Sequence, residues 1–157
     1  MTAPHVPVTS STHALAVTMY VGMIVLGVAH ATGVISSRAV QEVLASPWEE
    51  IWAGLHLIGP IMAAAGALAA AHRKLPIYSM SAELVGCAIF AITKGTYVVC
   101  LFTVYGLEGG PSTQIMGAGI AIGCAARATQ VGLELSRLVA AAHATTSPEP
   151  ATAPTGR

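Results

Sequence analysis

The sequence contains no aspartate, and charged residues of all kinds make up only 9% of its 157 positions. A soluble domain of this size needs far more charge to cover its surface. Seven basic and seven acidic residues give a formal net charge of zero at pH 7, so the basic surface that nucleic acids require is missing. The composition therefore argues against a soluble protein and against a nucleic-acid partner.

Cysteine is scarce, and the three cysteines present lie inside apolar segments without Cys-x-x-Cys spacing: Cys87, Cys100 and Cys124. This arrangement fits neither a disulfide framework nor a zinc site, so we expect small packing residues. The sequence also lacks Gly-x-Ser-x-Gly, a Walker-type lysine and His-Glu-x-x-His. We therefore expect a protein that is not an enzyme and that has no metal site and no cofactor.

Four long apolar stretches fill most of the chain, at residues 14–35, 51–71, 82–105 and 113–135. An α-helix rises about 1.5 Å per residue, so about 20 apolar residues cross a hydrocarbon core about 30 Å thick. The sequence therefore predicts an all-α fold, an antiparallel four-helix transmembrane bundle formed by residues 14–140. Residues 1–13 are expected to form a polar N-terminal lead, and residues 141–157 a disordered tail rich in Thr, Ser, Pro and Ala.

Two connections between the stretches have a predictable form. The apolar spacing within residues 36–50 predicts a short interfacial helix that ends at Ser46 and Pro47. Residues 106–111 predict a tight turn, which makes the third and fourth spans antiparallel neighbours.

The distribution of basic and aromatic residues predicts the orientation. Lysine and arginine collect on the cytoplasmic side of membrane proteins. With both termini inside, that side holds Arg73, Lys74, Arg137 and Arg157, against Arg38 outside. Aromatic side chains prefer the two membrane interfaces, so we expect Trp48, Trp52 and Tyr105 at the outer interface, and Tyr20 and Tyr78 near the inner one.

Small residues mark positions where two helices can approach closely. We expect such helix packing at Gly59 and Gly66 in the second stretch and at Gly119 and Gly123 in the fourth. Pro60 removes one backbone hydrogen bond and is expected to kink the second span.

Ionisable side chains inside a span cost about 2.5–3.5 kcal/mol on insertion scales, so each needs a partner or water. Glu83 and Lys94 are eleven residues apart and share a face of the third span, while Arg127, Gln130 and Glu134 share a side of the fourth. We call these five residues the polar seam. We expect an Arg127–Glu83 ion pair, with Lys94 using backbone carbonyls, Thr93, Thr96 or water. The seam is either an internal clasp that fixes helix register or the hydrated wall of an ion path or oligomeric pore.

His30 and His56 form a second candidate site. They lie on antiparallel neighbouring spans, each four or five residues from the outer end, so their depths match. Matched histidines on adjacent helices are what bis-imidazole haem ligation requires. Histidines that lie at the membrane interface without a ligand are the alternative.

The chain resembles holins, the small multi-span membrane proteins encoded in lysis cassettes of phages that infect Actinobacteria. The resemblance covers the general plan of the whole chain, together with Trp48 and Trp52 before the sequence Leu-Ile-Gly-Pro that ends at Pro60, and Arg127 followed by Ala128 and Gln130. It implies homo-oligomerisation in the host cytoplasmic membrane, abrupt formation of holes that depolarise the cell, and a functional link to an endolysin.

Three other functions stay open. The chain could be an accessory or assembly membrane subunit without activity of its own. It could be a small transporter or channel, although four-span multidrug exporters need an acidic residue in the first span, and this one has none. It could also be a redox anchor that binds haem through His30 and His56.

Overall fold

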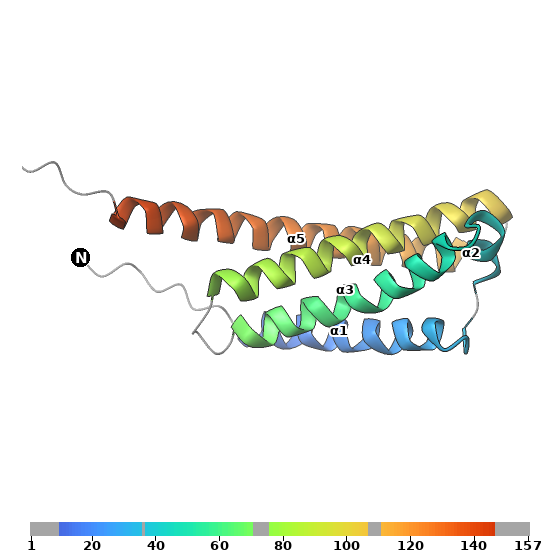
Figure 1. Ribbon diagram of the computed structural model, residues 1–157, viewed down its shortest axis with the longest axis horizontal. Helices are drawn as coiled ribbons and strands as arrows, with labels where there is room; N and C mark the ends of the chain where they lie inside the picture. Colours follow the sequence, from blue (N-terminus) through green and yellow to red (C-terminus); the bar gives the residue numbers. More distant parts are fainter. Residues whose placement is uncertain (1–9, 36, 71–75, 107–110, 147–157) are drawn as a thin grey trace, which may run out of the picture.

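The computed structural model describes residues 10–35, 37–70, 76–106 and 111–146, and regular structure within them is entirely helical. The helices are α1 (Ser10–Ala31), α2 (Arg38–Val43), α3 (Trp48–Ala70), α4 (Pro76–Tyr105) and α5 (Pro111–Thr146). Successive long helices run in opposite directions, so α1 begins at the end of the molecule where α5 finishes (Figure 1). The predicted all-α fold is confirmed.

Two of the helices, α3 and α4, are long and apolar enough to cross a membrane. The apolar part of α1, Leu15–Ala31, is shorter, and α5 does not meet the same criterion of length and hydropathy. By length and composition, the described residues therefore contain two candidate spans where the sequence predicted four.

The helix boundaries follow the sequence in most places. Residues 36–50 contain the predicted short helix, α2, and the Ser37 side chain caps it by accepting a hydrogen bond from the backbone N–H of Val40. In contrast, α5 continues to Thr146, beyond the expected end of the span at residue 135 and into the segment expected to be disordered. The rest of that tail, the start of the N-terminal lead and most of the predicted turn at 106–111 lie outside the described residues.

The closest packing joins α3 to α4, because glycines let the two backbones meet. A Cβ atom at Gly66 would overlap the backbone nitrogen of Glu83, and one at Gly86 would overlap the backbone nitrogen of Ala63. A Cβ at Gly59 would lie 3.1 Å from the carbonyl oxygen of Gly86. The helix-packing role predicted for Gly59 and Gly66 is confirmed, and α3 continues without a break through the buried Pro60.

The other predicted packing face, Gly119 and Gly123, makes no contact with the described part of the chain. A Cβ atom at either position would meet nothing within 4 Å among the described residues, and both glycines are exposed on α5. The face that α5 turns towards the rest of the bundle passes through Gly117 and Cys124, so the close contact at Gly119 and Gly123 stays a prediction.

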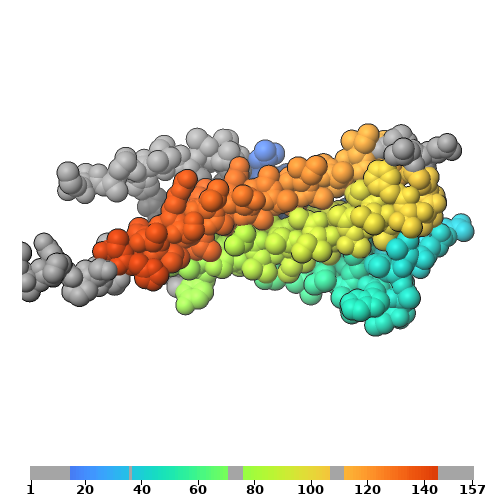
Figure 2. Space-filling view, turned by 90° about the horizontal axis from the view of Figure 1, so that it is seen from above, coloured from blue at the N-terminus to red at the C-terminus, as the bar shows by residue number. Residues whose placement is uncertain are grey.

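The long helices are arranged so that α1 packs on α3, α3 on α4, and α4 on α5. Figure 2 shows α5 lying along α4 for most of its length, with α2 and the start of α3 at the opposite end from the finish of α5. No comparably extensive backbone packing joins α1 to α5 in the described part of the chain. Side chains from all four long helices meet in the central core: Tyr20, Met23, Ala63, Ala64, Ala67, Cys87, Phe90 and Cys124.

Candidate functional site

The carboxylate of Glu83 is the centre of a buried polar group that joins three helices. Glu83 on α4 is only 3% exposed. One of its oxygens, Oε1, accepts hydrogen bonds from Arg127 Nε on α5 at 2.9 Å and from the Tyr20 hydroxyl on α1 at 3.0 Å. Arg127 Nη2 lies 2.8 Å from the same oxygen. The predicted Arg127–Glu83 ion pair is therefore present.

Tyr20 is a member of this group that the sequence did not predict. We expected it at the inner interface, but it is 1% exposed and lies in the core. Its hydroxyl contacts both Glu83 and the Cys87 sulfur, which is 3.2 Å away. A buried phenol needs a hydrogen-bond partner. The position of Tyr20 inside a predicted span was therefore the sequence feature that could have indicated this contact. We call Tyr20, Glu83, Cys87 and Arg127 the Glu83 cluster.

Gln130 and Glu134 do not belong to the buried seam predicted for them, because both are exposed on α5. The buried line of this helix passes through Cys124 and Val131. Gln130 precedes Val131 by one residue, about 100° around the helix, and so points away from the bundle. Arg127 lies beside the buried line and reaches Glu83 because its side chain is long.

Lys94 is buried, at 4% exposure, but is separate from the Glu83 cluster. Its ammonium lies 5.5 Å from the centre of the Phe90 ring and 5.3 Å from that of the Tyr97 ring, within the range of cation–π attraction. Within the described residues, no ion pair or hydrogen bond reaches the ammonium, and the hydroxyls of Thr93 and Thr96 donate to carbonyls of their own helix. The predicted polar seam is therefore two separate sites.

An aromatic group surrounds the two candidate histidines. His30 lies 5.2 Å from His56 between ring centroids, and Trp52 lies 5.7 Å from His30 and 4.9 Å from His56. Trp52 was expected at the outer interface, yet it is buried and its indole N–H donates to the carbonyl of Thr93 at 2.9 Å. Sequence patterns place a tryptophan near a span end but do not indicate that a partner helix covers it.

This arrangement does not fit haem held between the two histidines. The imidazole rings are already in contact, tilted by 46°, and leave no gap for a macrocycle between them. His56 is 0% exposed and lies inside the bundle. Both of its ring nitrogens lack a hydrogen-bond partner among the described residues, whereas His30 Nδ1 donates to the Leu26 carbonyl.

Two cavities meet at His30. One, of about 340 Å³, opens at the α2 end of the bundle and is lined by Glu49, Glu50 and Trp52 among others. The other, of about 160 Å³, lies between α1 and α5 and is lined by Lys94 and Tyr97. We call the second the Lys94 cavity. His30 contributes to the walls of both.

No group of three or more histidine, cysteine or acidic side chains in the described ranges could hold a metal ion. The three cysteines are free and buried. Comparisons with models of protein families, with curated proteins and with solved structures found no match.

Proposed function

We propose that this chain is a four-pass protein of the cytoplasmic membrane that oligomerises and permeabilises it in the manner of a holin. The distribution of side chains supports membrane insertion. Large apolar residues are exposed on all four long helices, whereas Glu83 and Lys94 are turned inward. The exposed set includes Leu15, Val25, Ile58, Ile92, Val99, Ile115 and Ile122. Apolar side chains facing outward and charges facing inward suit a protein surrounded by lipid.

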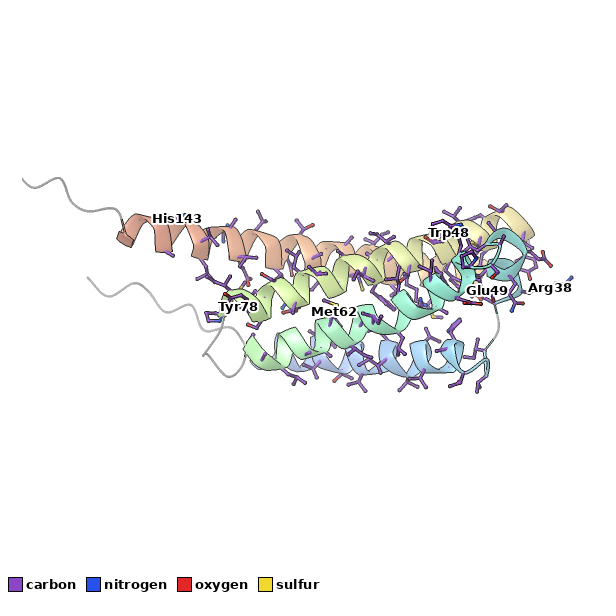
Figure 3. The ribbon with its side chains drawn as sticks, in the orientation of Figure 1. Arg38, Trp48, Glu49, Met62, Tyr78 and His143 are labelled. Carbon is purple, nitrogen blue, oxygen red and sulfur yellow. The ribbon has the colours of Figure 1, made fainter. Side chains whose placement is uncertain are left out.

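An orientation with both termini on the cytoplasmic side agrees with the residues that lie at the two ends of the bundle. Arg38, Trp48 and Glu49 gather at one end, and Tyr78 and His143 at the other (Figure 3). Trp48 and Tyr78 are exposed, as aromatic residues of the two interfaces would be. In this orientation the part of α5 that contains Arg137 and His143 projects on the cytoplasmic side.

The observation that carries the proposal is the open face of Gly119 and Gly123. Among the described residues nothing contacts these glycines, although small residues four apart typically form the contact between two membrane helices. A second copy of α5 is the natural partner for this face, and lateral association of copies is the first step of holin action. Glu83, Arg127 and Lys94 would supply the polar groups that a water-filled hole needs once the helices rearrange.

Induced expression in a bacterial host tests the proposal. We expect wild-type protein to stop growth and to collapse the membrane potential, measured with a potential-sensitive dye. Gly123→Leu should prevent or delay the collapse, because the larger side chain would separate the α5 helices. Gly22→Leu is the matched control, since Gly22 is also exposed with nothing within 4 Å but lies on α1.

Two results would contradict the proposal. Cells that stay polarised with abundant wild-type protein in the membrane would refute permeabilisation and favour an accessory subunit. An equal effect of Gly22→Leu and Gly123→Leu would refute the role of the α5 face.

A further inference from the structure

The Lys94 cavity contains polar and apolar side chains together. Lys94, Tyr97 and His30 contribute polar groups to its wall, while Leu26, Met116 and Ile120 contribute apolar surface. It lies between α1 and α5, the pair of neighbouring long helices without extensive backbone packing in the described residues. A ligand could therefore enter from the side of the bundle.

The ammonium of Lys94 is the group in this cavity that lacks a counterpart. Lys94 is 96% buried, since its exposure is 4%, and in the described part of the chain it has aromatic contacts but no anionic or hydrogen-bonding partner. Glu49 and Glu50 line the other cavity and are not among the residues that line this one. A buried charge without a partner is costly, so an anion from outside the chain would be strongly favoured here.

We propose that the Lys94 cavity binds the anionic head of a membrane amphiphile, with a carboxylate or phosphate oxygen paired to the Lys94 ammonium. The cavity has a volume of about 160 Å³, and we place the head group in it because Lys94 lies in its wall. The alkyl chain of the amphiphile would leave the cavity along Leu26, Ile120 and Met116. Of these residues, Met116 is 65% exposed. Tyr97 and His30 can orient the head through their polar atoms.

The charge of the site decides against other ligands. A metal cation would be repelled by Lys94, and a neutral carbonyl compound would leave the ammonium without a counter-charge. This binding is separate from the proposed permeabilisation, because it can be measured on purified protein in a neutral detergent without a membrane potential.

Trp52 provides the signal for a binding experiment. Its ring lies 5.7 Å from His30 and 6.2 Å from Tyr97, both of which line the cavity. The chain has two tryptophans, so Trp48→Phe leaves Trp52 as the single fluorophore. In this background, purified protein is titrated with oleate, phosphatidylglycerol, phosphatidylcholine or inorganic phosphate while Trp52 emission is recorded.

We expect a saturable change in emission with oleate, with phosphatidylglycerol, or with both, and a much weaker response to phosphatidylcholine. A response to oleate alone would identify a carboxylate as the head group, and a response to phosphatidylglycerol alone would identify a lipid phosphate. A response to inorganic phosphate but to neither amphiphile would overturn the proposal that the ligand is an amphiphile. Lys94→Met should weaken binding by about tenfold or more, because a hydrogen bond to a charged group is lost, whereas Lys94→Arg should retain it.

A second pair of variants avoids the buried position. Met116 and Ile115 are both exposed on α5, but only Met116 lines the cavity. Met116→Phe should therefore weaken binding by narrowing the entrance, and Ile115→Phe should leave it unchanged. Equal affinity of Lys94→Met and the parent protein, or equal binding of phosphatidylcholine and the anionic amphiphiles, would overturn the proposal.

Discussion

Replacing Glu83 by glutamine should destabilise the bundle by about 3 kcal/mol. Glu83→Gln preserves the shape of the side chain but removes the charge that Arg127 and the Tyr20 hydroxyl contact at 2.8–3.0 Å. Breaking a buried ion pair from one side costs about 3–5 kcal/mol. The Arg127 side chain is 30% exposed, so water screens the unpaired guanidinium and the lower end of this range applies.

Thermal unfolding in a mild detergent, followed by circular dichroism, measures this loss. For a chain of this size, about 3 kcal/mol corresponds to a fall of about 6–12 °C in the unfolding midpoint. Arg127→Met should be at least as harmful, because it leaves a carboxylate whose side chain is only 4% exposed. The double variant should be less destabilised than the sum of the two, since it removes both charges. A midpoint shift below about 2 °C for Glu83→Gln, or strict additivity, would refute the reasoning.

Three further outcomes follow from burial and contact. Gly66→Ala should destabilise the protein by about 1–3 kcal/mol in the same assay because its Cβ would overlap the α4 backbone, whereas Gly22→Ala should stabilise α1 by up to about 1 kcal/mol. Acrylamide should quench the fluorescence of Trp48, which is 63% exposed, far more than that of Trp52, which is 7% exposed. The variants Trp52→Phe and Trp48→Phe each leave one of these two fluorophores to be measured. A maleimide should label the folded protein poorly and the denatured protein fully, because each of its cysteines is 1% exposed: Cys87, Cys100 and Cys124.

Helix positions and the Arg127–Glu83 pair could be predicted from sequence because they depend on local quantities. Apolar length predicts a helix, and a charge within an apolar segment predicts a partner of opposite charge on the neighbouring helix. The short helix α2 was equally accessible, since its apolar spacing lies within one segment. The helix positions need no knowledge of how the helices rotate about their own axes.

The rotation of each helix about its own axis could not be predicted from the sequence. It decides that Gln130 and Glu134 face outward while Arg127 reaches inward, although all three share one side of an ideal helix. It also decides that Gly66 meets a backbone whereas Gly119 meets none. The burial of Tyr20 and Trp52 has the same origin, because each aromatic side chain faces a helix that only the assembled bundle places there.

The helices differ in how extensively they pack on one another. The side between α1 and α5 is therefore the easiest part of the bundle to open. Parting α3 from α4 would separate backbones that glycines hold in contact, whereas the described residues show no comparable backbone packing between α1 and α5. Moving α1 outward would break the Tyr20 hydroxyl contacts with Glu83 and Cys87 and part of the packing of α1 on α3. Such a swing would admit water first to Lys94 and then to the ion pair. If the protein permeabilises the membrane as proposed, these buried polar groups would form the wall of the hole only after the first helix turns aside.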